Sequence, residues 1–249
     1  MMDILNAWAM IAVFMTVVWM GYLWIKNPGV VDVAWSFGIM LLGLWYAHPY
    51  TPLHLITLIL IIFWALRLSG YLFLTRILKG EKDKRYLSLQ TQWKEVSLTY
   101  FINYQFQGVL QVVLSMGFYF IFLGASPLTW ISFIAILVIM IGFIGEIIAD
   151  YQLTQFKKNP ASAGQVCAVG LWSLSRHPNY FFEWLIWVGF ALLSQSSPYG
   201  WTAWISPITL YILMVYVTGP LTETQSLASR GDRYRSYMEV TPMFFPKIL

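Results

Sequence analysis

The chain carries little charge: only 10% of its 249 residues are Asp, Glu, Lys or Arg, against roughly a quarter in an average soluble protein. Apolar residues make up 59% of the chain, and aromatic residues make up 18%. A chain with so few charges does not match a soluble globular protein. The composition therefore indicates a polytopic membrane protein.

Other absences narrow the function. A single cysteine, Cys167, excludes an internal disulfide. The three histidines, His48, His54 and His177, have no metal-ligand spacing, so no metal site is expected. The chain contains neither Gly-x-Gly-x-x-Gly nor a P-loop, so it has no soluble nucleotide domain of those kinds. The net charge of +4 comes from cations in loops and does not predict nucleic-acid binding.

Long apolar runs predict the fold class. Most of the runs approach the ~20 residues that a transmembrane helix requires. They cover residues 4–25, 30–47, 53–74, 100–123, 128–149, 178–193 and 201–217. The first run is too long and too weakly basic at its start to be a cleaved signal peptide. We therefore expect an all-α fold of about seven transmembrane helices, forming one membrane-embedded domain over residues 1–249.

The cations predict the orientation of these helices. Apart from Arg67, all fifteen Lys and Arg residues fall in alternate loops or at the C-terminal end. They are Lys26, Arg76, Lys79, Lys82, Lys84, Arg85, Lys94, Lys157, Lys158, Arg176, Arg230, Arg233, Arg235 and Lys247. The intervening loops 48–52, 124–127 and 194–200 carry none. Because cytoplasmic loops are enriched in cations, the N-terminus is predicted outside and the C-terminus in the cytosol, as in a bacterial inner-membrane protein.

Polar residues gather where the sixth run begins. Asn179 and Glu183 are four residues apart and share one helix face, and Arg176 and Tyr180 form a second such pair beside them. His177 precedes Pro178, which suits the first position of a helix. Either these groups line a ligand site, or Arg176 snorkels to water and Tyr180 belongs to an interfacial aromatic belt.

Two acidic residues lie at the end of the fifth run. Glu146 and Asp150 are also four residues apart, and like charges at this spacing oppose helix formation. One interpretation is that Lys157, Lys158 or a neighbouring helix neutralises them. The other is that they accept hydrogen bonds from the hydroxyls or amide of a ligand.

Polar groups also occur inside the earlier runs. Arg67 lies in the middle of the third run and needs an anion, for which Asp32 is the obvious candidate. Alternatively, Asp32 faces a pocket and donates a proton. Gln107 and Gln111 either line that pocket or join helices to one another, and Gly108 between them allows close approach of a neighbouring helix.

The C-terminal segment from Glu223 to Tyr237 is amphipathic, charged and aromatic. An interfacial helix accounts for its cations without a ligand. Glu223, Arg233 and Tyr234 are nevertheless candidates for a ligand site.

Taken together, several motifs resemble the membrane steroid 5α-reductase family, in particular its bacterial branch, from about residue 27 to the end. They are Val-Val-Asp32-Val-Ala-Trp35, Asp150-Tyr-Gln-Leu-x-x-Phe156, Gly170-Leu-Trp-x-x-Ser-Arg-His-Pro-Asn-Tyr-x-x-Glu183-Trp, Glu223 to Tyr237 and the Phe-Phe-Pro246 ending. The Ser-Arg-His-Pro-Asn-Tyr core is also similar to isoprenylcysteine carboxyl methyltransferases and sterol reductases. Asp150 and the Asn179 and Glu183 pair favour the reductases.

The resemblance implies a seven-helix bundle that holds NADPH in a cytosol-facing cavity, with a steroid entering between helices from the lipid. It implies cofactor contacts from Arg76, Asp150, Lys157, Arg176, His177, Asn179, Tyr180, Glu183, Glu223 and Tyr234. Glu146 and Arg233 join this set from their positions in the sequence.

The chain departs from the family where the substrate is held. The early helices lack a Gln-Glu pair, and Trp64 occupies the position of a family tyrosine. Asp32 is therefore the first candidate for proton donor and Tyr71 the second, while Trp35, Trp64, Gln107 and Gln111 are candidates for substrate contacts. The expected activity is NADPH-dependent reduction of the C=C bond of a Δ4-3-oxosteroid or similar enone lipid.

Two other functions remain open at this point. One is an S-adenosylmethionine-dependent membrane methyltransferase acting on a lipid-soluble carboxylate or amine. The other is a non-enzymatic sterol- or lipid-binding membrane protein.

Overall fold

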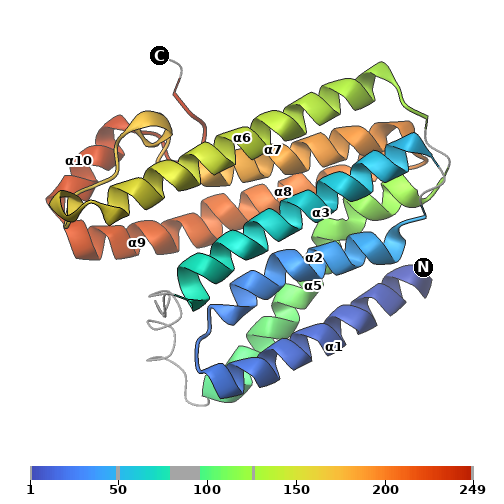
Figure 1. Ribbon diagram of the computed structural model, residues 1–249, viewed down its shortest axis with the longest axis horizontal. Coiled ribbons are helices and arrows are strands. Elements are labelled where there is room, and N and C mark those ends of the chain that lie inside the picture. The colour runs from blue at the N-terminus through green and yellow to red at the C-terminus, as the bar shows by residue number, and fades with distance from the viewer. Residues whose placement is uncertain (1, 49–50, 79–95, 125–126, 248–249) are drawn as a thin grey trace. The chain divides into compact units, whose positions relative to one another are not determined.

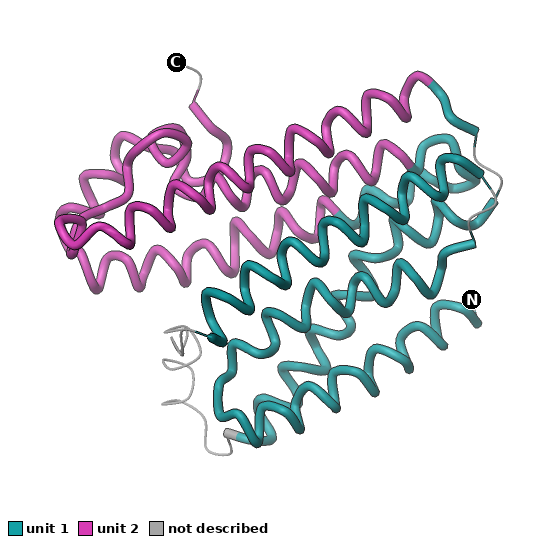
Figure 2. Tube along the Cα trace, in the orientation of Figure 1, with its two compact units in different colours: residues 1–129, 194–206 teal, residues 130–193, 207–249 magenta. Residues whose placement is uncertain are grey.

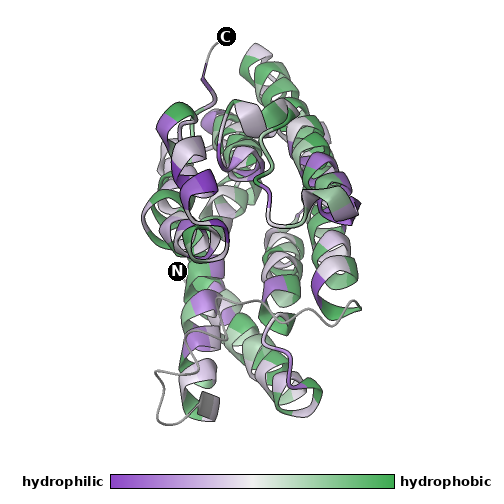
Figure 3. Ribbon diagram, turned by 90° about the vertical axis from the view of Figure 1, so that its left-hand side faces the viewer, coloured by the Kyte–Doolittle hydropathy of each residue, from purple (hydrophilic) through white to green (hydrophobic). Residues whose placement is uncertain are grey.

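The computed structural model of the protein describes residues 2–48, 51–78, 96–124 and 127–247 (Figure 1). Every regular element within these residues is a helix, which confirms the all-α class. In the described part of the chain, five helical segments are long and apolar enough to cross a membrane: Met2–Ile25, Pro52–Ile77, Ser97–Phe122, Trp130–Lys158 and Gly200–Arg230. Apolar residues cover much of these helices, as Figure 3 shows. The protein therefore has the helices of a polytopic integral membrane protein.

The second and sixth apolar runs form shorter helices. They are α2 (Val30–Tyr46) with 17 residues and α7 (Pro178–Leu193) with 16 residues. Both are shorter than the about 20 residues of a typical span. Among the predicted loop cations, Lys79, Lys82, Lys84, Arg85 and Lys94 lie outside the described residues.

The chain divides into two compact units (Figure 2). Unit 1 comprises residues 1–129 and 194–206, and unit 2 comprises residues 130–193 and 207–249. The candidate residues of the sequence analysis divide along the same line. Asp32, Trp35, Trp64, Tyr71, Arg76, Gln107 and Gln111 belong to unit 1, and the other candidates belong to unit 2.

The described residues of unit 1 form four main helices. They are α1 (Met2–Ile25), α2, α3 (Pro52–Leu72) and α5 (Val96–Phe122), with the 3-10 turns η4 (Ser194–Ser196) and η5 (Gly200–Trp204) beside α5. A π-helical turn, η1 (Phe73–Ile77), extends α3. The side chain of Thr51 accepts a hydrogen bond from the amide of His54 and caps α3, whose first residue is a proline.

Unit 2 is built around two antiparallel helices, α6 (Trp130–Lys158) and α7, which lie side by side in Figure 1. The loop between them contains the 3-10 turns η2 (Pro160–Ser162) and η3 (Gly170–Ser173). After α8 (Ile205–Ile212), which enters unit 2 at Pro207, come the π-helical turn η6 (Leu213–Thr218), α9 (Gly219–Arg230) and α10 (Asp232–Val240).

Glycines set the distance between α6 and α7. A Cβ atom at Gly142 would lie 2.6 Å from Cγ1 of Ile186 and 2.9 Å from the carbonyl oxygen of Phe182. Gly145 faces the ring of Phe182 in the same way. The two helix backbones therefore approach closely, as small residues allow in membrane proteins.

The last apolar run does not end where the sequence suggested. Helical structure continues from residue 217 through Gly219 and Pro220 to Arg230. Proline lacks an amide hydrogen, and its ring clashes with the carbonyl four residues earlier. The π-helical turn η6 ends at Thr218, two residues before the proline, and accommodates it without ending the helix.

Candidate functional site

The packing of α6 on α7 brings two predicted polar pairs together. Because Gly142 lies against Ile186 and Gly145 against Phe182 in an antiparallel pair, Glu146 lies at the level of Glu183 and Asp150 at the level of Asn179. The residues Glu146, Asp150 and Glu183 are only 4%, 6% and 8% exposed. All three also take part in further interactions. Three acidic residues are thus buried within one pair of helices.

Two features of α7 give this cluster its geometry. The indole Nε1 of Trp187 donates to Oε1 of Glu183 at 2.8 Å, which fixes the carboxylate from one helical turn away. Oδ1 of Asn179 is buried and has no hydrogen-bond donor among the residues that the structure describes. A buried polar atom left in this state costs about 1–3 kcal/mol. Asn179 therefore marks a place where a ligand donor would be stabilised.

A second cluster lies directly before α7. Nε and Nη2 of Arg176 donate to the two carboxylate oxygens of Glu223 at 2.6 and 3.2 Å. Nη1 of Arg176 donates to the carbonyl oxygens of Met238 and Thr241 at 3.1 and 2.6 Å. The arginine side chain is only 11% exposed, so it does not snorkel to water. Arg176 holds three segments of unit 2 together, a role that the sequence did not predict.

His177 belongs to the same cluster. Its Nε2 lies 3.2 Å from Oε1 of Glu223, and its ring stacks on Tyr180 with 5.0 Å between the ring centroids. The sequence paired Tyr180 with Arg176, whereas the structure places it against His177. Glu223 therefore joins α9 to both residues of the Arg176 and His177 pair.

Residues 237–247, which we call the C-terminal strap, hold the loop before α7. The amide of Arg176 donates to the carbonyl of Pro242, and the amide of Lys247 donates to the carbonyl of Leu174, both at 2.9 Å. The hydroxyl of Ser175 donates to the carbonyl of Phe244 at 2.9 Å, and the hydroxyl of Tyr237 donates to the carbonyl of Trp172. The contacts of the Phe-Phe-Pro ending were not predicted from the sequence.

The preceding loop is tied to α6 as well. The indole Nε1 of Trp172 donates to the carbonyl of Ala149 at 2.9 Å, and the amide of Leu171 donates to Oε1 of Gln152 at 3.0 Å. Gly170 has a φ of +55°, and its Cα approaches the Gln152 amide so closely that a side chain would collide with it. Gly170 and Trp172 of the sequence motif therefore fix the loop against the helix that carries Asp150.

The remaining candidates of unit 2 differ in exposure. Tyr234 is buried on α10, and burial, with Glu223 nearby, raises its pKa to about 12. Arg233 is exposed and donates to the carbonyl of Gly164 at 3.2 Å. Lys157 is exposed at the end of α6.

In unit 1 the structure shows a partner of Asp32. Its carboxylate pairs with Arg76, a partner that the sequence did not suggest. The hydroxyls of Ser36 and Ser69 lie 2.7 Å apart and set the register of α2 against α3. On this antiparallel register Asp32 lies level with η1, about two helical turns from Arg67. Arg67 has interactions of its own.

The candidate substrate residues of unit 1 differ in burial and in their contacts. Trp64 and Gln111 are fully buried. Nε2 of Gln111 lies 3.5 Å from Sδ of Met15 on α1, and Nε2 of Gln107 donates to Oδ1 of Asn103 on its own helix at 2.7 Å. Gln111 therefore contacts a neighbouring helix, as the interpretation that the glutamines join helices expected. Trp35 and Tyr71 are partly exposed.

Gly108 lies on α5, the helix that carries Gln107 and Gln111, and allows a neighbouring helix to approach closely, as the sequence predicted. A Cβ atom there would lie 3.1 Å from Cγ2 of Ile11 and 3.3 Å from Cγ of Met15. Both of these residues belong to α1.

Comparison with known proteins places the chain in a wider group. Residues 6–241 match the family described as "Protein of unknown function (DUF1295)". The chain is also 27% identical over 269 residues to an uncharacterized protein of Schizosaccharomyces pombe, covering 93% of this chain and 76% of the yeast protein. No solved structure matches the chain.

Proposed function

We propose that the chain, which belongs to the DUF1295 family of proteins of unknown function, is an NADPH-dependent reductase of an enone lipid such as a Δ4-3-oxosteroid. The resemblance of its motifs to the membrane steroid 5α-reductases supports this proposal. We also propose the finer topology: seven spans, with the N-terminus outside and the C-terminus and cofactor side in the cytosol, as the loop cations suggest.

The observation that carries the proposal is the buried cluster on α6 and α7. The donor-free Oδ1 of Asn179 suits the carboxamide of a nicotinamide or a ribose hydroxyl. The buried carboxylates Asp150 and Glu183 suit ribose hydroxyls, because carboxylates accept hydrogen bonds from such groups in dinucleotide sites. The residues of unit 2 therefore fit NADPH. The exposed cations Lys157 and Arg233 are the candidates for its phosphates.

The bound cofactor would supply the hydride that reduces the β-carbon of the enone. The chain's own residues would bind and orient the cofactor. Trp187 holds Glu183 in place, and Glu223 holds His177 against Tyr180. Because Arg176 is already engaged with Glu223 and two carbonyl groups, we assign it a positioning role and not a phosphate contact.

A side chain must also hydrogen-bond the ketone as it becomes an enolate and then supply a proton. Asp32 was the first candidate for this donor. The carboxylate of Asp32 is already engaged in an ion pair with Arg76. This pairing supports Tyr71, the second candidate, as the donor. It also argues against Arg76 as a phosphate ligand.

Cofactor titration tests the proposal. Asn179→Ala and Glu183→Ala should each weaken NADPH binding to the detergent-purified protein by about 1–3 kcal/mol, because each removes a buried hydrogen-bond partner. Gln155→Ala, at an exposed position of α6, is the matched control and should bind as the wild type does. Unchanged affinity in both site variants would contradict the proposal. Binding of S-adenosylmethionine instead of NADPH would favour a methyltransferase.

A further inference from the structure

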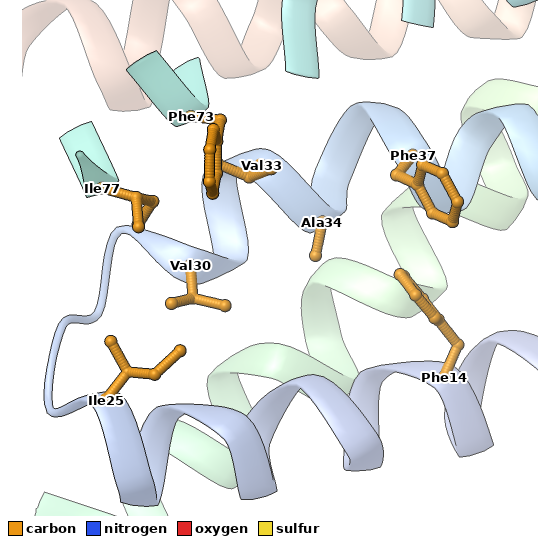
Figure 4. A pocket seen from close by; sticks show the side chains of 8 residues that line it. All are labelled: Phe14, Ile25, Val30, Val33, Ala34, Phe37, Phe73 and Ile77. Atoms are coloured by element: carbon orange, nitrogen blue, oxygen red, sulfur yellow. The ribbon is translucent and has the colours of Figure 1, made fainter. Parts of the chain in front are cut away.

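Unit 1 contains an apolar cavity that the proposed reaction does not use. It has a volume of about 270 Å³ and lies between α1, α2 and η1 (Figure 4). All of its lining side chains are hydrocarbon, including Phe14, Val33 and Phe37. The volume is slightly below the range for pockets that hold a whole drug-sized ligand, about 300–1,000 Å³.

The cavity is long for its volume. Its lining residues on α1, Phe14 and Ile25, are eleven positions apart, which corresponds to about 16 Å along a helix. Figure 4 shows Phe14 and Phe37 at one end and Ile25, Val30 and Ile77 at the other. A narrow hydrocarbon space of this length suits a single acyl chain.

The end with Ile25 and Val30 adjoins the turn between α1 and α2, and this turn contains an unusual lysine. Lys26 has a φ of 56°, and its amide donates to the carbonyl of Tyr22 at 2.8 Å, so it ends α1 in the left-handed conformation. Glycine is the usual residue at such a helix end, because a side chain there is sterically disfavoured.

The rest of the turn is fixed, and the nearby cation on η1, Arg76, is paired. Nδ2 of Asn27 donates to the carbonyl of Arg76 at 3.2 Å, and the amide of Gly29 donates to Oδ1 of Asn27 at 3.0 Å. Arg76 is paired with Asp32. The exposed ammonium of Lys26 makes no ion pair within the described residues and is the unneutralised positive charge beside the cavity.

We propose that this cavity binds one acyl chain of an anionic phospholipid whose phosphate contacts Lys26. The hydrocarbon lining matches the chain, and the lysine matches the headgroup. The site lies entirely within unit 1, and the proposal does not depend on NADPH or on the reduction.

Competition between two lipids tests the headgroup contact. The detergent-solubilised protein is given equimolar phosphatidylglycerol and phosphatidylcholine with identical acyl chains, and bound lipid is counted by native mass spectrometry. One basic residue near the headgroup should favour phosphatidylglycerol about fivefold. Lys26→Arg should keep this preference, and Lys26→Gly should reduce it to about one.

Because glycine suits the backbone at residue 26, Lys26→Gly should not melt below the wild type in detergent without added lipid. Lys26→Gln removes the charge with the side chain retained and provides the same test if the glycine variant is not recovered. Lys158→Gln, another exposed lysine at a helix end, is the matched control and should retain the preference. A fivefold preference that persists in both Lys26→Gly and Lys26→Gln overturns the proposal.

A second variant tests the chain contact. Val33 lines the cavity and is partly exposed, so Val33→Phe should fill the space without disturbing the core. Each protein molecule should then bind one lipid molecule fewer, whichever of the two lipids is offered. Full retention of that lipid in the Val33→Phe protein overturns the assignment of the cavity, whatever the result at Lys26.

Discussion

Arg176 and Glu223 form an ion pair in which both side chains are nearly buried, with 11% and 9% exposed. Arg235 and Asp232 form a pair on α10 that is 70% and 93% exposed. Water screens the second pair and not the first. The two pairs therefore offer a direct comparison of buried and exposed charge within one unit.

Loss of the buried anion should destabilise unit 2. In Glu223→Gln the guanidinium of Arg176 stays buried without its countercharge, and breaking such a pair typically costs about 3–5 kcal/mol. In Asp232→Asn the exposed pair is lost, and the cost should be about 0–1 kcal/mol. Thermal melting of both variants in the same detergent provides the measurement. Equal melting temperatures would show that Glu223 is not essential to the cluster.

At this scale the sequence predicts which residues matter better than it predicts their partners. Helical spacing was enough to place Glu146 with Asp150, and Asn179 with Glu183, on shared helix faces, because spacing depends only on helix geometry. The pairing of Asp32 with Arg76 was not predicted, since pairing depends on the register between two helices. That register is set by side chains such as the two serine hydroxyls, and no local pattern encodes it.

At the scale of elements, α6 and α7 are joined by backbone approach. Gly142 lies against rigid atoms, the carbonyl of Phe182 and the amide of Ile186, which would be 2.9 and 3.0 Å from a Cβ. Gly70 on α3 has no neighbouring atom within 4 Å of such a Cβ. The same substitution should therefore have opposite effects at the two sites.

Gly142→Ala should separate α6 from α7 and destabilise the protein by about 1–3 kcal/mol, the usual cost of forcing extra volume into packed structure. Gly70→Ala should be neutral or stabilising by up to about 1 kcal/mol, since alanine favours helix. Melting temperatures in detergent test both. If the Gly142→Ala protein melts at the same temperature as the wild type, close contact at this glycine is not the basis of the packing.

Helix boundaries show which features of the elements can be predicted from the sequence. The start of α7 at Pro178 and the end of α1 at Ile25 agree with the apolar runs, because proline and charge mark these ends locally. The passage from η6 into α9 was missed. Proline usually ends a helix, and only a wider turn with a glycine beside it allows the helix to continue.

At the scale of the whole molecule, the sequence predicts a side of the membrane for every loop. The chain offers a clean test, because its single cysteine is a poor target. Cys167 is 8% exposed, and burial raises the pKa of its thiol. Less of it is thiolate at neutral pH than for an exposed cysteine. Its alkylation should be slow at pH 7 and should speed up as the pH rises toward that raised pKa.

Cysteines introduced at exposed positions should then report topology. Tyr199→Cys lies in a loop predicted outside, and Lys158→Cys lies in a loop predicted in the cytosol; both positions are exposed. A membrane-impermeant maleimide at pH 7 should label Tyr199→Cys in intact cells and Lys158→Cys only after permeabilisation. Labelling of both in intact cells would overturn the orientation derived from the cations.

The C-terminal strap has a consequence for synthesis. Arg176 donates to the carbonyl of Thr241, which follows it by 65 residues. At a translation rate of about 5–20 residues per second, Thr241 is made roughly 3–13 s after Arg176. During this interval the loop before α7 lacks the carbonyl groups that will hold it. Unit 2 therefore passes through a stage on the ribosome in which α6 and α7 have been made but the arginine is still without its acceptors, and membrane quality control can act on the nascent chain at that stage.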